Sequence, residues 1–377
     1  MAHLHPEIDP DGLLEYSVVF TDRSLNHMSQ RFQGAMRGIS AILREAYGAS
    51  AVALVPGGGT VAMESVARQF ATGRKALVIR NGFFSFRWSQ IFDTGAIPSA
   101  HTVCKARPVA PGSRQPFAPA PLADVLAAIR SERPAVVCAP HVETAAGIVL
   151  PDAYLRAVAE AVHEVGGLFV LDCIASGALW VDLRATGVDV LVSAPQKGWS
   201  GTPCAGFVML GERAMAVLPS TTSTSFAVDL RRWLAIMEAY EKGGHAYHAT
   251  LPTDGLYRTW QQMQATRDAG FAALRAAQEE LGAAVRSLLV ARGFPSVAAP
   301  GFEAPSVVVS YTTEDAIQNG KAFLAAGLQT AAGVPLQCDE PADFKTFRIG
   351  LFGLDKLGNP ARTVDSLARA LDAIGAR

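Results

Sequence analysis

The sequence predicts an α/β protein whose large domain contains a mostly parallel sheet and is followed by a smaller α+β domain. Up to about residue 210, short apolar runs rich in Val, Leu and Ile alternate with helical patterns. Gly, Pro or polar residues bound these runs, which is typical of strands buried on both faces of a parallel sheet. After residue 250 the alternation gives way to a long helical stretch and isolated strand-like runs.

The elements follow from these patterns in chain order. Six apolar runs are predicted as strands of the large domain: 50–56, 75–80, 135–140, 167–172, 189–195 and 205–210. Apolar residues at helical spacing predict helices between them, at 122–130, at 151–165 and directly after the glycines at 57–59. The second part predicts one long helix at 256–292, strands at 306–311 and 346–352, and helices at 316–326 and near the C-terminus.

The predicted domain boundary lies where the long helix begins. We expect an N-terminal arm at 1–25, a large α/β domain at 26–255, and the long linking helix with the small α+β domain at 256–377. Both domains have enough apolar residues for a core, since half of the 377 residues are hydrophobic.

The charge balance narrows the class of partner. The chain has 33 basic and 34 acidic residues in scattered positions, which is not the pattern of a nucleic-acid or membrane-surface protein. No uninterrupted apolar run approaches the roughly 18 residues of a membrane span. Five dispersed cysteines without a C-x-x-C motif fit a reducing compartment and predict no metal site. We therefore expect a cytoplasmic protein that acts on small molecules.

A glycine-rich turn after the first predicted strand is a candidate phosphate site. Gly57, Gly58 and Gly59 precede Thr60 and a helical pattern. Glycines at such a turn let backbone N–H groups approach an anion at the helix N-terminus. The spacing matches neither G-x-G-x-x-G nor a P-loop, so a dinucleotide site and a nucleotide P-loop are disfavoured. A tight turn without a ligand is the alternative.

Two charged residues follow other predicted strands. Asp172 ends the run at 167–172, where a carboxylate must find a partner or a cap. Lys197 follows the run at 189–195 in a Gly- and Pro-bounded turn, where a desolvated amine can act as a Schiff-base nucleophile. A phosphate cradle, a carboxylate and a lysine at strand ends are what a pyridoxal phosphate site requires.

The segment 171–210 resembles the core of the class V aminotransferases, which are fold type I pyridoxal phosphate enzymes, and is closest to the alanine:glyoxylate and serine:pyruvate group. The resemblance extends in colinear order over most of the chain, through 27–29, 56–65, 80–87, 140–152, 246–258 and 347–353. It implies a mostly parallel seven-stranded sheet flanked by helices.

The resemblance also implies roles for individual residues. Lys197 would form the internal aldimine and shuttle a proton, and Asp172 would pair with the pyridinium nitrogen. The phosphate would be held by Gly58, Gly59, Thr60 and Gln196.

The same resemblance places residues around the cofactor ring, the substrate and the subunit interface. Phe84 would stack on the ring, Ile174 would press on its other face, and Thr144 would reach its phenolic oxygen. Tyr247 and Thr250 would contact the phosphate of the neighbouring subunit, which implies a homodimer with active sites at the interface. Arg348 would bind the substrate carboxylate. The alternative for each of these residues is a purely structural role, such as core packing or helix capping.

These features predict an aminotransferase that moves an amino group from a small amino acid such as alanine or serine to glyoxylate or pyruvate, by a ping-pong mechanism. The alternatives are a pyridoxal phosphate-dependent lyase, a cysteine desulfurase-like enzyme, a 2-aminoethylphosphonate:pyruvate aminotransferase and a catalytically silent sensor. This sequence lacks the Pro-Gly-Pro turn that members of the family usually carry before their first helix. Arg23 stands near that place and could supply a second anion contact for the substrate. A desulfurase would need a nucleophilic thiol; Cys338 stands ten residues before Arg348, and we expect it to be a buried or incidental cysteine rather than that thiol.

Overall fold

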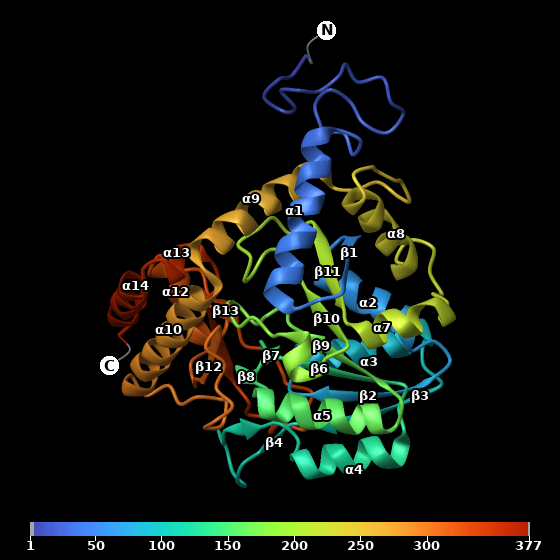
Figure 1. Cartoon of the computed structure of the whole chain (residues 1–377). Coiled ribbons are helices and arrows are strands. Elements are labelled where there is room, and N and C mark those ends of the chain that lie inside the picture. The colour runs from blue at the N-terminus through green and yellow to red at the C-terminus, as the bar shows by residue number, and fades with distance from the viewer. Residues whose placement is uncertain (1–3, 376–377) are drawn as a thin grey trace.

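A seven-stranded sheet forms the centre of the large domain (Figure 1). The computed structural model describes residues 4–375. The strands, in their order across the sheet, are β1 (Ala51–Pro56), β11 (Ala205–Leu210), β10 (Val190–Ser193), β9 (Leu168–Asp172), β6 (Val136–Pro140), β2 (Lys75–Arg80) and β3 (Ala100–Lys105). Only β11 runs antiparallel to its neighbours, so the predicted mostly parallel sheet is confirmed.

The six predicted strands of this domain are all present, and β3 is the strand that the sequence analysis missed. It lies at the edge of the sheet, beyond β2, and is mostly half-buried. Its sequence, AHTVCK, mixes polar and apolar residues over a short length instead of forming an apolar run. An edge strand needs less apolar sequence than a central one, because fewer of its side chains are covered.

Helices cover this sheet. They are α1 (Gln30–Tyr47), α2 (Gly59–Phe70), α3 (Phe83–Gly95), α4 (Leu122–Glu132), α5 (Asp152–Glu164), α6 (Leu183–Thr186), α7 (Glu212–Val217), the 3₁₀ helix Leu218–Ser220 and α8 (Leu230–Glu241). In Figure 1, α4 and α5 lie side by side along one side of the sheet, while α1 and α8 lie toward the end that carries the N-terminal arm. Helix α1 begins where Ser29 Oγ accepts the Phe32 N–H and ends at Gly48, which has φ 65°.

The predicted single helix at 256–292 is wrong, because two helices occupy this stretch. They are α9 (Thr253–Ala269) and α10 (Phe271–Ala291), separated by Gly270 with φ 87°. The predicted helix at 316–326 is likewise two short helices, α11 (Asp315–Gln318) and α12 (Lys321–Ala325), with Gly320 at φ 78° between them. In both places a glycine takes a backbone conformation that a helix cannot continue through.

A second sheet of three strands lies in the C-terminal part of the chain. Its order is β12 (Val307–Tyr311), β14 (Thr346–Gly350) and β13 (Ala331–Ala332), all antiparallel. Two helices follow it, α13 (Leu354–Leu357) and α14 (Pro360–Ala373). Short two-stranded hairpins are formed by β4 (Arg107–Pro108) with β5 (Phe117–Ala118), and by β7 (Val142–Glu143) with β8 (Ile148–Val149). The division at residues 25 and 255 stays a prediction.

The strand directions decide where side chains with chemistry can meet. Strand β1 is antiparallel to β11, and β11 is antiparallel to β10, so β1 runs the same way as β10, β9 and β6. The carboxyl ends of these strands therefore lie at one edge of the sheet, where α/β proteins bind ligands. Within residues 4–375, no helix is long and apolar enough to cross a membrane.

Candidate active site

One cavity at the carboxyl edge of the sheet brings together most of the predicted site. Eight of the predicted cofactor-binding residues line it: Gly59, Thr60, Phe84, Thr144, Asp172, Ile174, Gln196 and Lys197. They come from the segments that follow β1, β2, β6, β9 and β10, and are far apart in the sequence. Gly58 is the residue before Gly59 and caps the same helix. The geometry therefore places the phosphate cradle, the carboxylate and the lysine at one site.

Asp172 is the last residue of β9 and is almost completely buried, with 8% of its surface exposed. Its Oδ1 accepts a hydrogen bond from the backbone N–H of Ile174 at 2.9 Å. Burial raises the pKa of this carboxyl to about 6, while the Ile174 N–H and the nearby Lys197 charge act in the opposite direction. A buried carboxylate with so few partners is suited to a cationic ligand group.

Lys197 lies in the turn after β10 and points into the same cavity. Its Nζ is 5.9 Å from the centre of the Phe84 ring and 5.5 Å from the centre of the Phe352 ring. Burial lowers the pKa of Lys197, Asp172 raises it, and Arg348 lowers it further. A lysine with a lowered pKa has more of the neutral amine that a nucleophile or a base needs.

The N-terminal end of helix α2 faces the cavity without a side-chain cap. Gly58, its N-cap, has an extended backbone and no side chain to bond the first N–H groups of the helix. A Cβ on Gly59 would lie 2.4 Å from Ile174 Cδ1, so any larger residue at this position would displace the Ile174 side chain. Uncapped N–H groups and the helix dipole favour an anion here.

Arg87 lines the cavity and was missed by the sequence analysis. Its Nη1 donates a hydrogen bond to Thr60 Oγ1 at 3.0 Å, and its guanidinium carbon lies 5.3 Å from the centre of the Phe84 ring. A signal was present in the sequence. Arg87 follows Phe84 by three residues in a helical pattern, so the two side chains share a helix face.

Arg348 approaches the site from the small sheet but does not line the cavity that contains Lys197. Its guanidinium carbon is 5.3 Å from the centre of the Phe84 ring, and its Nε donates to the Ala332 carbonyl at 2.7 Å. Burial lowers the pKa of Arg348, although a guanidinium stays charged at neutral pH. The structure thus places a cation from the second sheet beside the same ring.

Tyr247 and Thr250 lie outside the cavity. Their hydroxyl oxygens are 3.1 Å apart, and more than half of the surface of Tyr247 is exposed. The chain therefore does not bring them into its own site, and their predicted contact with a neighbouring subunit stays a prediction.

Arg23 is exposed in the N-terminal arm and does not line the cavity. Cys338 is buried, and its thiol donates to the Arg80 carbonyl at 3.4 Å. Burial raises the pKa of this thiol to about 12, so the thiolate that a nucleophile needs does not form at neutral pH.

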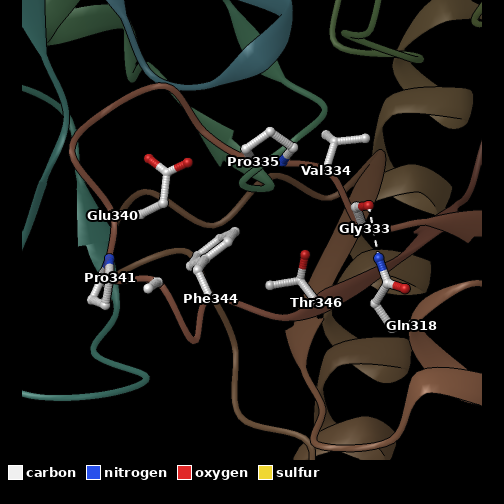
Figure 2. A pocket seen from close by; sticks show the side chains of 9 residues that line it. Gln318, Gly333, Val334, Pro335, Glu340, Pro341, Phe344 and Thr346 are labelled. Carbon is white, nitrogen blue, oxygen red and sulfur yellow. Dashed lines mark hydrogen bonds between the residues drawn. The ribbon is translucent and has the colours of Figure 1, made fainter.

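A cavity of about 320 Å³ lies elsewhere, beside the small sheet. Figure 2 shows Phe344 and Thr346 below Pro335 and Val334, with the Gln318 side chain donating to the Gly333 carbonyl. It contains no lysine, arginine or histidine among its lining residues. The chemistry therefore selects the smaller cavity around Lys197 as the candidate active site.

The residues present fit pyridoxal phosphate. The uncapped N-terminus of α2, Thr60 and Arg87 together form a donor set for a phosphate. Asp172 is a buried carboxylate that would suit the pyridine nitrogen, and Lys197 is an amine that would suit covalent attachment. Phe84 and Ile174 line the same cavity as side chains that can pack on a flat ring.

Comparisons with known proteins find aminotransferases among the relatives of this chain. The chain is 26% identical over 352 residues to 2-aminoethylphosphonate--pyruvate transaminase 2 of Paraburkholderia xenovorans, covering 92% of this chain and 90% of that protein. It is 29% identical over 343 residues to 2-aminoethylphosphonate--pyruvate transaminase of Burkholderia thailandensis, covering 89% and 87%. No family model matches the chain.

The fold is shared with solved structures. Alanine--glyoxylate aminotransferase from Nostoc superposes with a TM-score of 0.77 at 22% identity, covering 93% of this chain and 89% of that chain. The predicted fold class and the predicted resemblance to class V aminotransferases are confirmed. The prediction of an aminotransferase is confirmed at the level of enzyme class, while the amino donor and the oxo-acid acceptor remain predictions.

Proposed function

We propose that this chain is a pyridoxal phosphate-dependent aminotransferase that moves an amino group from a small amino acid to a small 2-oxo acid in two half-reactions. The observation that carries the proposal is the meeting of Lys197, Asp172 and the uncapped N-terminus of α2 in one cavity. Each lies at the carboxyl end of a different strand, and each would supply a different part of a cofactor site.

When bound, pyridoxal phosphate supplies an electron-withdrawing ring that stabilises negative charge at the substrate α-carbon. The Asp172 carboxylate would hold a proton at the pyridine nitrogen, a role that a buried carboxylate can fill. Lys197 Nζ would hold the cofactor and would take and return a proton at the substrate α-carbon. The first N–H groups of α2, with Thr60, Gln196 and Arg87, would bind the phosphate.

Arg348 is the residue that we assign to the substrate carboxylate. Its guanidinium carbon lies 5.3 Å from the centre of the Phe84 ring. Among the described residues, its side chain donates a hydrogen bond to the Ala332 carbonyl and forms no ion pair with a carboxylate. A planar guanidinium can bind a carboxylate through two parallel hydrogen bonds. This contact fits alanine or serine as donor and glyoxylate or pyruvate as acceptor.

A second candidate reaction is transfer from 2-aminoethylphosphonate to pyruvate. The two curated relatives described above carry that name, although neither reaches 30% identity to this chain. A phosphonate needs strong hydrogen-bond donors, and arginine suits this task as well as it suits a carboxylate.

A cysteine desulfurase is less well supported. Its mechanism needs a nucleophilic thiolate near the bound substrate. Cys338 is buried, donates to a backbone carbonyl and has its pKa raised by burial. A lyase with the same fold would need no such thiol. Analysis of the products that the enzyme releases would distinguish it from an aminotransferase.

The active unit that we propose is a homodimer in which Tyr247 and Thr250 reach the phosphate of the neighbouring subunit. Their exposed, mutually hydrogen-bonded hydroxyl groups are available to a second chain. The N-terminal arm also exposes large apolar side chains, which favours an interface. The most exposed of these are Leu13, Tyr16 and Val18. A cytoplasmic location remains part of the proposal.

The experiment that tests the function mixes the purified holoenzyme with single amino donors in the absence of an acceptor. Alanine, serine, glycine and 2-aminoethylphosphonate are compared, and the absorbance of the cofactor is followed. A true donor converts the aldehyde form of the cofactor to the amine form, and adding pyruvate or glyoxylate reverses the change. Release of pyruvate or sulfide without the amine form would favour the lyase or the desulfurase instead.

A further inference from the structure

Glu143 is a fully buried acidic residue next to the candidate active site, at the end of β7. It does not line the cavity, although its neighbours Val142 and Thr144 do. Its carboxylate accepts four hydrogen bonds. Oε1 accepts from the backbone N–H groups of Phe84 at 3.2 Å and Ala145 at 2.9 Å, and Oε2 accepts from the Ser85 N–H at 2.9 Å and the Ser85 hydroxyl at 2.6 Å.

Three of these hydrogen bonds come from the first turn of α3. The N-cap of that helix is Gly82, which has no side chain to accept the free N–H groups. Glu143 therefore caps α3 from a segment about 60 residues further along the chain. A carboxylate is the favoured charge at a helix N-terminus.

The close approach depends on Gly82. A Cβ at this position would lie 2.7 Å from Glu143 Cγ and 3.0 Å from Ala145 Cβ, so any larger residue would push the β7 segment away from the helix. The small size of Gly82 and the hydrogen bonds of Glu143 thus together hold α3 against the hairpin of β7 and β8.

The helix turn that Glu143 holds carries Phe84. The ring of Phe84 lies 5.9 Å from Lys197 Nζ and 5.3 Å from the guanidinium carbon of Arg348. The negative charge of Glu143 also raises the pKa of both Lys197 and Arg348, so it acts electrostatically on the two cations that the proposed function uses.

We propose that Glu143 is a positioning residue of this site: its carboxylate fixes the first turn of α3, and with it the Phe84 ring, and places a negative charge near Lys197. The effect of Glu143 on catalysis rests on the proposed function. Its effects on the position of α3 and on the protonation of Lys197 are independent of that function. Both can be measured on the full chain without cofactor.

The test compares Glu143→Gln with Ser85→Ala. Glutamine keeps the shape but removes the charge and one acceptor. Ser85→Ala keeps the charge and removes the hydroxyl group, which donates to Glu143 and to the Gly82 carbonyl and accepts from the Asn81 and Gly82 N–H groups. We expect both variants to exchange the Phe84 and Ser85 amide hydrogens faster than the wild type, by about tenfold or more in Glu143→Gln, because hydrogen bonds to a charged group are the stronger ones.

A second measurement distinguishes the effect of the Glu143 charge on Lys197 from the effect of the Glu143 hydrogen bonds on α3. The rate at which Lys197 is acylated is measured against pH by peptide mass spectrometry, in chain stripped of cofactor. The charged groups that act on Lys197 are Asp172, Arg348, Glu143 and Arg87, and only one of them changes in Glu143→Gln. We expect a lower pKa of Lys197 in Glu143→Gln and an unchanged one in Ser85→Ala.

Unchanged amide exchange in α3 and an unchanged pKa of Lys197 in Glu143→Gln would overturn the proposal. If this variant does not fold, Gly82→Ala replaces it, since the added methyl group displaces the glutamate, and it is expected to speed the same amide exchange. A chain that passes these tests but transaminates no donor would contradict the proposed function and leave the role of Glu143 intact.

Discussion

Arg87 Nη1 lies 3.0 Å from Thr60 Oγ1, so a guanidinium of α3 is hydrogen-bonded to the first turn of α2. The two helices follow β1 and β2, which lie apart in the sheet order, with four strands between them. This contact supplies a positive charge at the helix N-terminus where we place the cofactor phosphate.

Replacing Arg87 by alanine is therefore expected to weaken pyridoxal phosphate binding by about tenfold or more, because a hydrogen bond between charged groups contributes about 1.5 to 3 kcal/mol. Equilibrium dialysis of the cofactor against the purified chain measures this. Arg87→Lys keeps the charge but not the planar donor set and should fall between the wild type and Arg87→Ala. Equal affinity in all three proteins would remove Arg87 from the phosphate site.

Gly59→Ala is expected to reduce cofactor affinity for a steric reason. The new Cβ would lie 2.4 Å from Ile174 Cδ1, so Ile174 must move toward the place where we expect the cofactor ring. The matched control is Gly34→Ala in α1, where no atom lies within 4 Å of an added Cβ. The control should bind the cofactor as the wild type does, and equally tight binding by Gly59→Ala would contradict the expectation.

Asp172→Asn is expected to change how the stability of the cofactor-free chain depends on pH. Burial raises the pKa of Asp172 from its ordinary value of 3.8 to about 6, so between these values the folded chain binds more protons than the unfolded chain. The free energy of unfolding of the wild type therefore falls as pH rises through this window, by up to about 3 kcal/mol. Asparagine does not titrate, so this contribution to the pH dependence of the unfolding free energy is absent from Asp172→Asn.

Urea unfolding of both proteins at pH 4.5 and 7.5 measures the effect. We expect the variant to gain stability relative to the wild type between the two pH values. The same substitution should weaken the cofactor site, since the pyridine nitrogen loses its acid partner. A difference in stability that is the same at both pH values would show that Asp172 titrates as an ordinary carboxyl.

Mixing two inactive variants tests the proposed contact between subunits. One partner carries Lys197→Ala, and the other carries Tyr247→Phe with Thr250→Ala. If the two hydroxyl groups serve the neighbouring subunit, a hybrid dimer contains one site with all three residues intact. Activity should then reappear after mixing under conditions that exchange subunits, whereas residues that serve their own subunit would restore none.

The sequence predicted the central part of the fold because buried parallel strands are continuous apolar runs. It missed β3, whose edge position requires no such run, and it merged α9 with α10 because apolar spacing continues on both sides of Gly270. The backbone angle at this glycine, φ 87°, ends the helix and cannot be read from spacing.

The candidate site was predictable where its residues follow strands or match the family. Asp172 and Lys197 end or follow apolar runs, so strand direction alone brings them to one edge. Arg87 and Glu143 were missed for different reasons. Arg87 looks like any polar residue of a helix face, and Glu143 acts through backbone N–H groups of a segment distant in sequence.

The central claim is that Lys197 is the lysine that holds pyridoxal phosphate. Treating the holoenzyme with sodium borohydride, digesting it and locating the cofactor by peptide mass spectrometry tests this directly. We expect the added pyridoxyl mass on the peptide that contains Lys197, and none on any other lysine. A holoenzyme whose label falls on another lysine, or whose peptides carry no label, would contradict the account.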